Sequence, residues 1–196
     1  MKKFELTTNT KMFLGKKLFQ IKALISFGDV KAGELGGYIE KEENLSQTGD
    51  AWVFDNAWVS GDARVSGNAW VTDNARVTDN ARVFDNAWVS GDARVSGNAR
   101  VFDNAWVSGN ARVFDNAWVS DNARVSDNAR VSGDAWVSDN ACYTTIKGFG
   151  REYRTTTFFR CKDGKVRVQC GCFYGDLKEF RAIVKKTHGE SKKAKE

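Results

Sequence analysis

Four side chains near the C-terminus are of types that could bind a metal ion. The chain has one histidine and four cysteines. A tetrahedral zinc site takes four such ligands, and the candidates are Cys161, Cys170, Cys172 and His188. Two of these cysteines have the spacing Cys-x-Cys, whereas zinc sites favour Cys-x-x-Cys. We therefore expect small, buried thiols on a hairpin, with no metal and no other cofactor.

Tryptophan and arginine share one position of a regular pattern in the middle of the chain. All seven tryptophans lie between residues 52 and 136, interspersed with eight arginines. Exposed tryptophans form apolar patches that mark interfaces, and arginine binds anions or stacks on aromatic rings. The candidate binding residues in this region are Trp52, Trp70, Trp88, Trp106, Arg76, Arg94, Arg112 and Arg130.

The C-terminal segment is strongly basic. Residues 143–196 carry 14 basic and 6 acidic side chains, in a chain with a net charge of +5. Basic strands that also carry aromatic residues can bind phosphates or single-stranded nucleic acid. The candidates are Arg151, Arg154, Arg160 and Arg167. A soluble basic face is the alternative interpretation, and nucleic acid would then not be a partner.

Thirteen aspartates between residues 49 and 142 form a regular array. Such an array could suggest calcium, but the calcium-binding β-roll repeat is a glycine-rich nonapeptide, which this unit is not. We expect these residues to make turns, asparagine ladders and ion pairs with neighbouring arginines.

The residues above are positioned by a six-residue unit that is repeated fifteen times over residues 51–140 without a gap. The unit reads Ala, Trp or Arg, Val, Ser, Thr or Phe, Gly or Asp, then Asn or Asp. Alanine and valine point to one face of an extended segment, and the residues between and after them point to the other. The last two residues favour a turn. Such units must coil and stack to bury their apolar face.

Written from valine, the unit is Val-x-x-x-Ala-x, which resembles the hexapeptide repeat of left-handed parallel β-helices. The resemblance implies three units per coil, about five coils, and stacking of residues eighteen apart. The Trp/Arg position then sorts into three ladders. They are Trp52, Trp70, Trp88, Trp106 and Arg124; Trp58, Arg76, Arg94, Arg112 and Arg130; and Arg64, Arg82, Arg100, Trp118 and Trp136.

Both flanking segments add to this resemblance. The run from Gly28 to Glu40 and the segment Cys170-Gly171-Cys172-Phe173 are similar to a group of phage and prophage proteins. These proteins have an N-terminal cap, a hexapeptide-repeat helix and a small Cys-containing C-terminal domain. We therefore expect an all-β solenoid with a β cap in residues 1–48, a left-handed parallel β-helix in 49–141, and a basic domain of a β-hairpin plus a helix in 142–196.

The flanks also carry local signals. In the cap, we expect strands at Lys3–Leu6, Lys11–Phe13 and Lys17–Leu24, and turns at Phe27–Val30 and Gly33–Gly37. Leu45 falls in the repeat register where an alanine would be. In the C-terminal domain, we expect strands at Tyr143–Lys147, Arg151–Cys161 and Lys165–Cys170.

A helix should follow these strands. Asp176 and Glu179 predict its capping box, and Gly189 predicts its end. Its apolar stripe would consist of Leu177, Phe180, Ile183 and Val184.

The resemblance also bears on catalysis. Hexapeptide-repeat acyltransferases use a histidine as general base and bind substrate in loops, but the lone histidine here, His188, lies outside the repeats, and no loop interrupts residues 51–140. We therefore favour a non-catalytic phage or prophage accessory binding protein, in particular a counter-defence factor that binds a host protein or sequesters an anionic nucleotide-type ligand. The alternatives are an acyltransferase-like enzyme and a self-assembling structural protein.

The composition also sets the expected surroundings. No signal peptide or apolar membrane span is evident, so we expect no membrane partner, a place in the bacterial host cytoplasm and reduced thiols. Helices of the resembled type associate through flat faces, which leads us to expect a homodimer or homotrimer.

Overall fold

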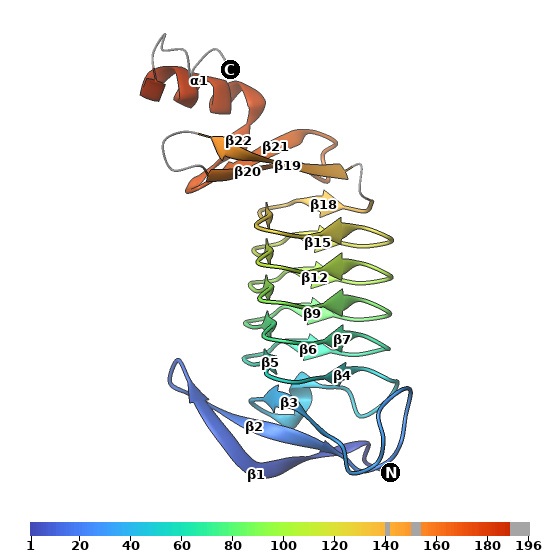
Figure 1. Ribbon diagram of the computed structural model, residues 1–196. Coiled ribbons are helices and arrows are strands. Elements are labelled where there is room, and N and C mark those ends of the chain that lie inside the picture. Colours follow the sequence, from blue (N-terminus) through green and yellow to red (C-terminus); the bar gives the residue numbers. More distant parts are fainter. Residues whose placement is uncertain (140–141, 150–153, 189–196) are drawn as a thin grey trace.

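The computed structural model describes residues 1–139, 142–149 and 154–188. The chain forms a β-solenoid of about six turns (Figure 1). An N-terminal antiparallel segment covers one end, and an antiparallel sheet with one helix covers the other. In the described ranges, no helix is long and apolar enough to cross a bilayer.

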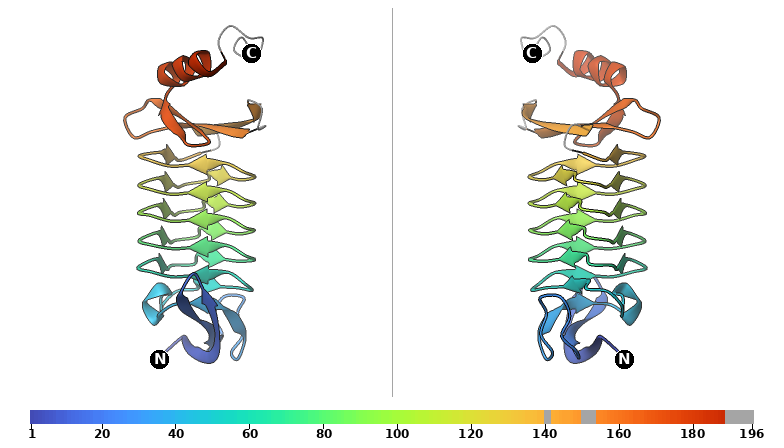
Figure 2. Two further views of the ribbon diagram at one scale, coloured as in Figure 1. Left: turned by 90° about the vertical axis from the view of Figure 1, so that its left-hand side faces the viewer. Right: turned by 90° about the vertical axis from the view of Figure 1, so that its right-hand side faces the viewer.

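Three parallel sheets form the sides of the solenoid, and strands of successive turns stack along each side (Figure 2). The β4 sheet contains β4 (Trp52–Val53), β7 (Trp70–Val71), β10 (Trp88–Val89), β13 (Trp106–Val107) and β16 (Arg124–Val125). The β5 sheet contains β5 (Trp58–Val59), β8 (Arg76–Val77), β11 (Arg94–Val95), β14 (Arg112–Val113) and β17 (Arg130–Val131). The β6 sheet contains β6 (Arg64–Val65), β9 (Arg82–Val83), β12 (Arg100–Val101), β15 (Trp118–Val119) and β18 (Trp136–Val137).

Residues eighteen apart are neighbours in these sheets. Trp88 pairs with Trp106 and Val89 with Val107, and the Trp88 amide donates to the Ala105 carbonyl at 2.9 Å. The three predicted Trp/Arg ladders are therefore confirmed. The alanines and valines of the repeats are at most 1% exposed, which confirms that they form the core.

The N-terminal cap consists of β1 (Phe4–Phe13), β2 (Lys16–Ala23) and β3 (Leu35–Ile39), which pair in that order, and β3 pairs in parallel with β5. The prediction of two separate strands at Lys3–Leu6 and Lys11–Phe13 was wrong, because β1 is continuous. Between Leu6 and Thr10 its register with β2 shifts. This irregularity accommodates the extra residues of β1 without ending the strand.

The predicted turn at Gly33–Gly37 was also wrong for most of its length, because β3 begins at Leu35. A Cβ atom at Gly36 would lie 2.6 Å from the Val53 carbonyl oxygen, and one at Gly37 would lie 2.6 Å from that of Ala57. These two glycines therefore allow backbone segments to approach closely, which is the other use of glycine in a strand.

Leu45 is displaced from the predicted register. It bridges to Val65 instead of stacking on Ala63. It follows the short 3₁₀ helix η1 (Glu42–Asn44), and the chain from there to β4 is two residues longer than in the regular repeat. This early turn raises the total to about six turns, where about five were expected.

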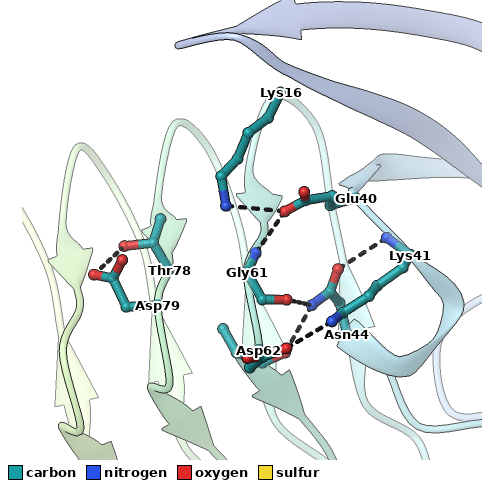
Figure 3. A network of polar contacts seen from close by, with 9 residues as sticks. Lys16, Glu40, Lys41, Asn44, Gly61, Asp62, Thr78 and Asp79 are labelled. Atoms are coloured by element: carbon teal, nitrogen blue, oxygen red, sulfur yellow. Dashed lines mark hydrogen bonds and ion pairs between the residues drawn. The ribbon is translucent and has the colours of Figure 1, made fainter.

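Polar contacts join the cap to the first regular turn (Figure 3). The Glu40 carboxylate accepts hydrogen bonds from the Gly61 amide at 2.6 Å and from Lys16 at 3.1 Å. The buried Asn44 amide donates to the carbonyls of Gly61 and Ala63. These side chains bond the outermost strand edge, which would otherwise lack partners on that side.

The C-terminal domain contains four antiparallel strands and one helix, where a hairpin and a helix were expected. The elements are β19 (Tyr143–Phe149), β20 (Arg154–Arg160), β21 (Val166–Cys170), β22 (Phe173–Asp176) and α1 (Leu177–His188). The missed strand, β22, is joined to β21 by a turn in which Gly171 has a φ of 61°. The predicted start of β20 at Arg151 and the predicted helix end at Gly189 lie outside the described residues.

The C-terminal sheet packs between the solenoid and α1 (Figure 1). Its inner face places Phe159 in the core and Cys161 beside Ala135. The reciprocal hydrogen bonds between Asp176 and Glu179, each 2.8 Å, confirm the capping box. The apolar stripe of α1 is covered only in part.

Phe180 packs on Phe158 and Phe173, whereas Leu177 and Ile183 stay exposed.

Candidate binding surfaces

The β5 sheet carries a ladder of four arginines, which we call the β5 arginine ladder. Arg94 pairs with Arg76 on one side and with Arg112 on the other, and Arg112 pairs with Arg130. Adjacent strands lie about 4.8 Å apart, so the four cationic side chains stand close together. Arg94 and Arg112 are exposed, and Arg76 and Arg130 are half-buried.

No described carboxylate forms an ion pair with these four arginines. Burial and the charge of Arg94 lower the pKa of Arg76, although Asp92 acts in the opposite direction. Burial, Arg94 and Arg130 lower the pKa of Arg112. The expected ion pairs with aspartates are therefore not found in this ladder among the described residues, although Asp92 acts on Arg76 at longer range.

The aspartates are used in the corners of the coil. Asp73 and Asp79 adopt positive φ values of 59° and 62°. Their carboxylates accept hydrogen bonds from the amides of Gly91 at 2.8 Å and Gly97 at 3.1 Å, one turn further along. Asparagine ladders run beside them, through Asn68, Asn86 and Asn104, and through Asn80, Asn98, Asn116 and Asp134. This confirms the predicted turn chemistry.

Aromatic residues flank both ends of the β5 arginine ladder. The Arg76 guanidinium lies 4.8 Å from the centre of the Phe13 ring, and that of Arg130 lies 5.6 Å from the Phe114 ring. Lys11 of the cap lies over the ring of Tyr38, 3.7 Å from its centre. Burial and the charge of Arg76 lower the pKa of Lys11. The positive stripe therefore extends from the cap along the side of the solenoid.

The candidate tryptophans lie on a different side, the β4 sheet. Trp52 is 0% exposed because Phe4 and Phe27 pack against it. Trp52 was a candidate binding residue, but it is not part of any exposed surface. Trp58, which lies beside Arg76 on the β5 sheet, is likewise buried and packs against Phe13. The cap covers both residues.

Three tryptophans further along form a partly exposed row, which we call the tryptophan row: Trp70, Trp88 and Trp106. Trp88 stacks on Trp106 with ring centres 5.1 Å apart and planes 8° apart, and it is 39% exposed. The Trp106 indole donates to the Ser90 hydroxyl at 3.2 Å, and the Arg124 guanidinium lies 5.4 Å from its ring. The structure does not join this row and the β5 arginine ladder into one surface.

Of the basic candidates of the C-terminal domain, the structure describes the side chains of Arg160 and Arg167, which lie on different strands. Arg167 is paired with Asp163 at 2.8 Å. Arg160 is exposed at the end of β20, and Arg154 begins the same strand. Arg151 lies outside the described residues.

The candidate metal ligands are distributed over several elements. Cys161 is buried, with the Tyr174 hydroxyl 4.0 Å from its Sγ, and burial raises the pKa of its thiol. The Thr156 hydroxyl donates to the Cys170 Sγ at 3.0 Å, and Cys172 is exposed. His188 is the last residue of α1. Across the described ranges, no three His, Cys, Asp or Glu side chains gather around a metal position.

A groove on the β6 sheet was missed by the sequence analysis. It has a volume of about 440 Å³ and is lined by Arg64, Arg82, Arg100, Ser66, Phe84 and Glu43, together with the neighbouring Ser46 and Val65. The third predicted ladder already placed these three arginines side by side. The further signal was Ser66, which lies eighteen residues before Phe84 and therefore beside it in the same column. A small residue next to a large one leaves space, and this pair could have located the groove.

The architecture places the molecule among the β-solenoids. The model of the YdcK Beta solenoid repeat matches residues 57–73, 75–91, 93–109, 105–121 and 123–139. The matched segments all lie within the repeats, so the repeat region is similar to this family's solenoid repeat. A search of curated proteins finds no match.

Proposed function

We propose that this protein is a non-catalytic binding protein that holds an extended anionic ligand along the β5 arginine ladder. The observation that carries the proposal is the placement of four arginines on adjacent strands with no described carboxylate paired to them. Like charges that face one another across strands destabilise a sheet. A bound polyanion would remove this repulsion and bind through several charge-assisted contacts at once.

The surroundings of the ladder support a ligand longer than a single anion. Arg76 and Arg130 lie at the ends of the ladder, three strand spacings apart, which is roughly 14 Å. Lys11 extends the positive charge at the cap end. Phosphate groups along a chain, or an acidic surface of a host protein, would match such a stripe. A compact anion would contact only part of it.

The biological setting of the proposal rests on resemblance. The cap segment from Gly28 to Glu40 is similar to phage and prophage proteins, which supports a counter-defence role in the bacterial cytoplasm. In that role, the protein would bind a host protein or sequester a nucleotide-type ligand. The left-handed sense of the coil rests on the same resemblance.

The proposal is tested with a fluorescently labelled oligothymidylate as an extended polyanion, with binding followed by fluorescence polarisation. We expect binding that weakens steeply with salt, because phosphate contacts release counterions. Arg94→Gln combined with Arg112→Gln should weaken it by at least about a hundredfold, since each charged hydrogen bond contributes about 1.5–3 kcal/mol.

The matched control is Lys178→Gln combined with Arg181→Gln, which removes two exposed cations from α1 and should leave the affinity unchanged. Equal losses in both variants would show that overall charge, and not the β5 arginine ladder, determines binding. Affinity that follows only substitutions of Arg160 or Arg167 would move the site to the C-terminal domain and contradict the proposal.

A further inference from the structure

The groove on the β6 sheet lies where a serine precedes two stacked phenylalanines in one column of the repeat. Ser66, Phe84 and Phe102 occupy the same position in three successive turns. Phe84 and Phe102 stack with ring centres 5.0 Å apart and planes 1° apart. Ser66 is too small to continue the stack, so a space remains between Phe84 and the cap, lined by Ser66 and Ser46.

One face of the Phe84 ring is therefore available to a ligand. Phe102 covers the opposite face, and no other aromatic ring of the described chain packs on Phe84. A planar aromatic group in the groove would continue the column as its next ring. Offset stacking of aromatic rings at this separation is favourable.

The same groove carries three cations. Arg64, Arg82 and Arg100 are neighbours on adjacent strands and line the groove together. None of them forms an ion pair with a described carboxylate. A carboxylate, that of Glu43 in η1, stands at the cap end of the groove. An anionic group fits the arginines, and a hydrogen-bond donor fits Glu43.

We propose that this groove binds an aromatic phosphate of the nucleotide class, separately from the β5 arginine ladder. The base stacks on Phe84, the phosphates bind Arg64, Arg82 and Arg100, and Glu43 accepts a hydrogen bond from an amino or hydroxyl group. The proposal extends beyond the proposed function, because it concerns a different sheet, a compact ligand and a ring-binding contact that the β5 arginine ladder does not offer.

The test uses ATP as the probe in isothermal titration calorimetry, with inorganic triphosphate as a second probe that lacks the ring. Arg82→Gln should weaken both probes by at least roughly tenfold, because it removes charge-assisted hydrogen bonds to phosphate. Phe84→Ser should weaken ATP by roughly tenfold and leave triphosphate unchanged, since base stacking on an aromatic side chain is sequence-tolerant but ring-dependent.

The first control comes from the repeat itself. Serine already occupies the column of Phe84 at positions 66 and 120, so Phe84→Ser is compatible with the fold, which circular dichroism would verify. Arg181→Gln removes an exposed arginine of α1 and should leave ATP affinity unchanged. Absence of ATP binding, equal loss in Arg181→Gln and Arg82→Gln, or an unchanged ratio of ATP to triphosphate affinity in Phe84→Ser would each overturn the proposal.

Discussion

Gly37 lies at a position of the cap where the structure leaves no room for a side chain. A Cβ atom there would lie 2.6 Å from the Ala57 carbonyl oxygen and 2.8 Å from a Val53 methyl group. Both are parts of the solenoid core, which cannot yield as a flexible surface side chain would. The glycine is therefore required for contact between β3 and the first repeats.

We predict that Gly37→Ala lowers the free energy of unfolding by about 1–3 kcal/mol, the usual effect of overpacking a core. Urea denaturation would measure it. Glu5→Ala, at an exposed position of β1, is the control and should change stability by less than about 0.5 kcal/mol. Equal stability of Gly37→Ala and the wild type would show that the cap can shift to accept a methyl group.

Lys3 is a buried cation whose titration should affect stability. It is 2% exposed and donates to the Ala51 carbonyl at 2.8 Å and the Gly49 carbonyl at 3.2 Å. Burial lowers its pKa to about 8, although Asp50 acts in the opposite direction. The folded state therefore favours the neutral amine, and below pH 8 it bears the full cost of burying the charge.

As the pH rises from about 8 towards the unfolded value of 10.5, this cost disappears, so Lys3 makes the protein more stable over that range. We predict that the unfolding free energy of wild type relative to Lys3→Met increases by at most about 1.4 kcal/mol per pH unit. Denaturation of both proteins at several pH values between 8 and 10 checks this. Parallel pH profiles for the two would contradict it.

At the scale of elements, the junction between the cap and the solenoid is held by charge-assisted bonds. Glu40 accepts a hydrogen bond from the Gly61 amide at 2.6 Å. The hydrogen bond from Gly61 is the largest cause of the lowered pKa of Glu40, and Lys16 adds to it against the effect of burial. A lowered carboxyl pKa means that the contact stabilises the fold above the unfolded pKa and is lost as the pH falls.

We predict that Glu40→Gln destabilises the protein by about 1–2 kcal/mol at pH 7, because the hydrogen bonds to a charged acceptor become neutral ones. The difference from the wild type should shrink as the pH falls through the carboxylate range. Glu42→Gln, which removes a surface pair with Lys2, should have an effect of less than about 1 kcal/mol. A pH-independent difference for Glu40→Gln would mean that packing, and not charge, is responsible.

At the scale of the whole molecule, the sides of the solenoid have different character. The β5 sheet is cationic, the β4 sheet carries the tryptophan row, and the β6 sheet changes from arginine near the cap to tryptophan near the C-terminal domain. Both ends of the solenoid are covered by other elements, so the repeats themselves can associate only through their sides. An apolar side suits contact with another protein chain, whereas a cationic side suits an anion.

We predict a homodimer or homotrimer formed through the tryptophan row, of which Trp88 is the most exposed described member, at 39%. Trp88→Ser should shift the molar mass measured by light scattering towards the monomer. Trp136→Ser is the control, because Trp136 is similarly exposed, at 44%, but lies on the β6 sheet. A monomeric wild type would contradict the prediction, and dissociation by Trp136→Ser alone would assign the interface to the other side.

The sequence by itself determined the solenoid, its eighteen-residue register, its Ala/Val core and the capping box of α1. The capping box depends on residues close in sequence. The other three features depend on a strictly repeated pattern, in which the residues of one repeat predict the structure of all the others. The corner residues are predictable for the same reason, because glycine and aspartate adopt a positive φ more readily than most other residues.

Only the tertiary structure decided which of the patterned residues are accessible. Trp52 and Arg124 belong to the same ladder, yet the cap buries Trp52. In the sequence, Gly36 and Gly37 indicate a turn. In the structure, they allow β3 to approach the carbonyl groups of Val53 and Ala57. The groove needs Glu43 beside Ser66 and Phe84. The regular repeat brings Ser66 and Phe84 together, but Glu43 belongs to the early turn, where the chain departs from the repeat register. Contacts between the cap and the solenoid do not recur along the chain, so no periodic pattern in the sequence predicts them.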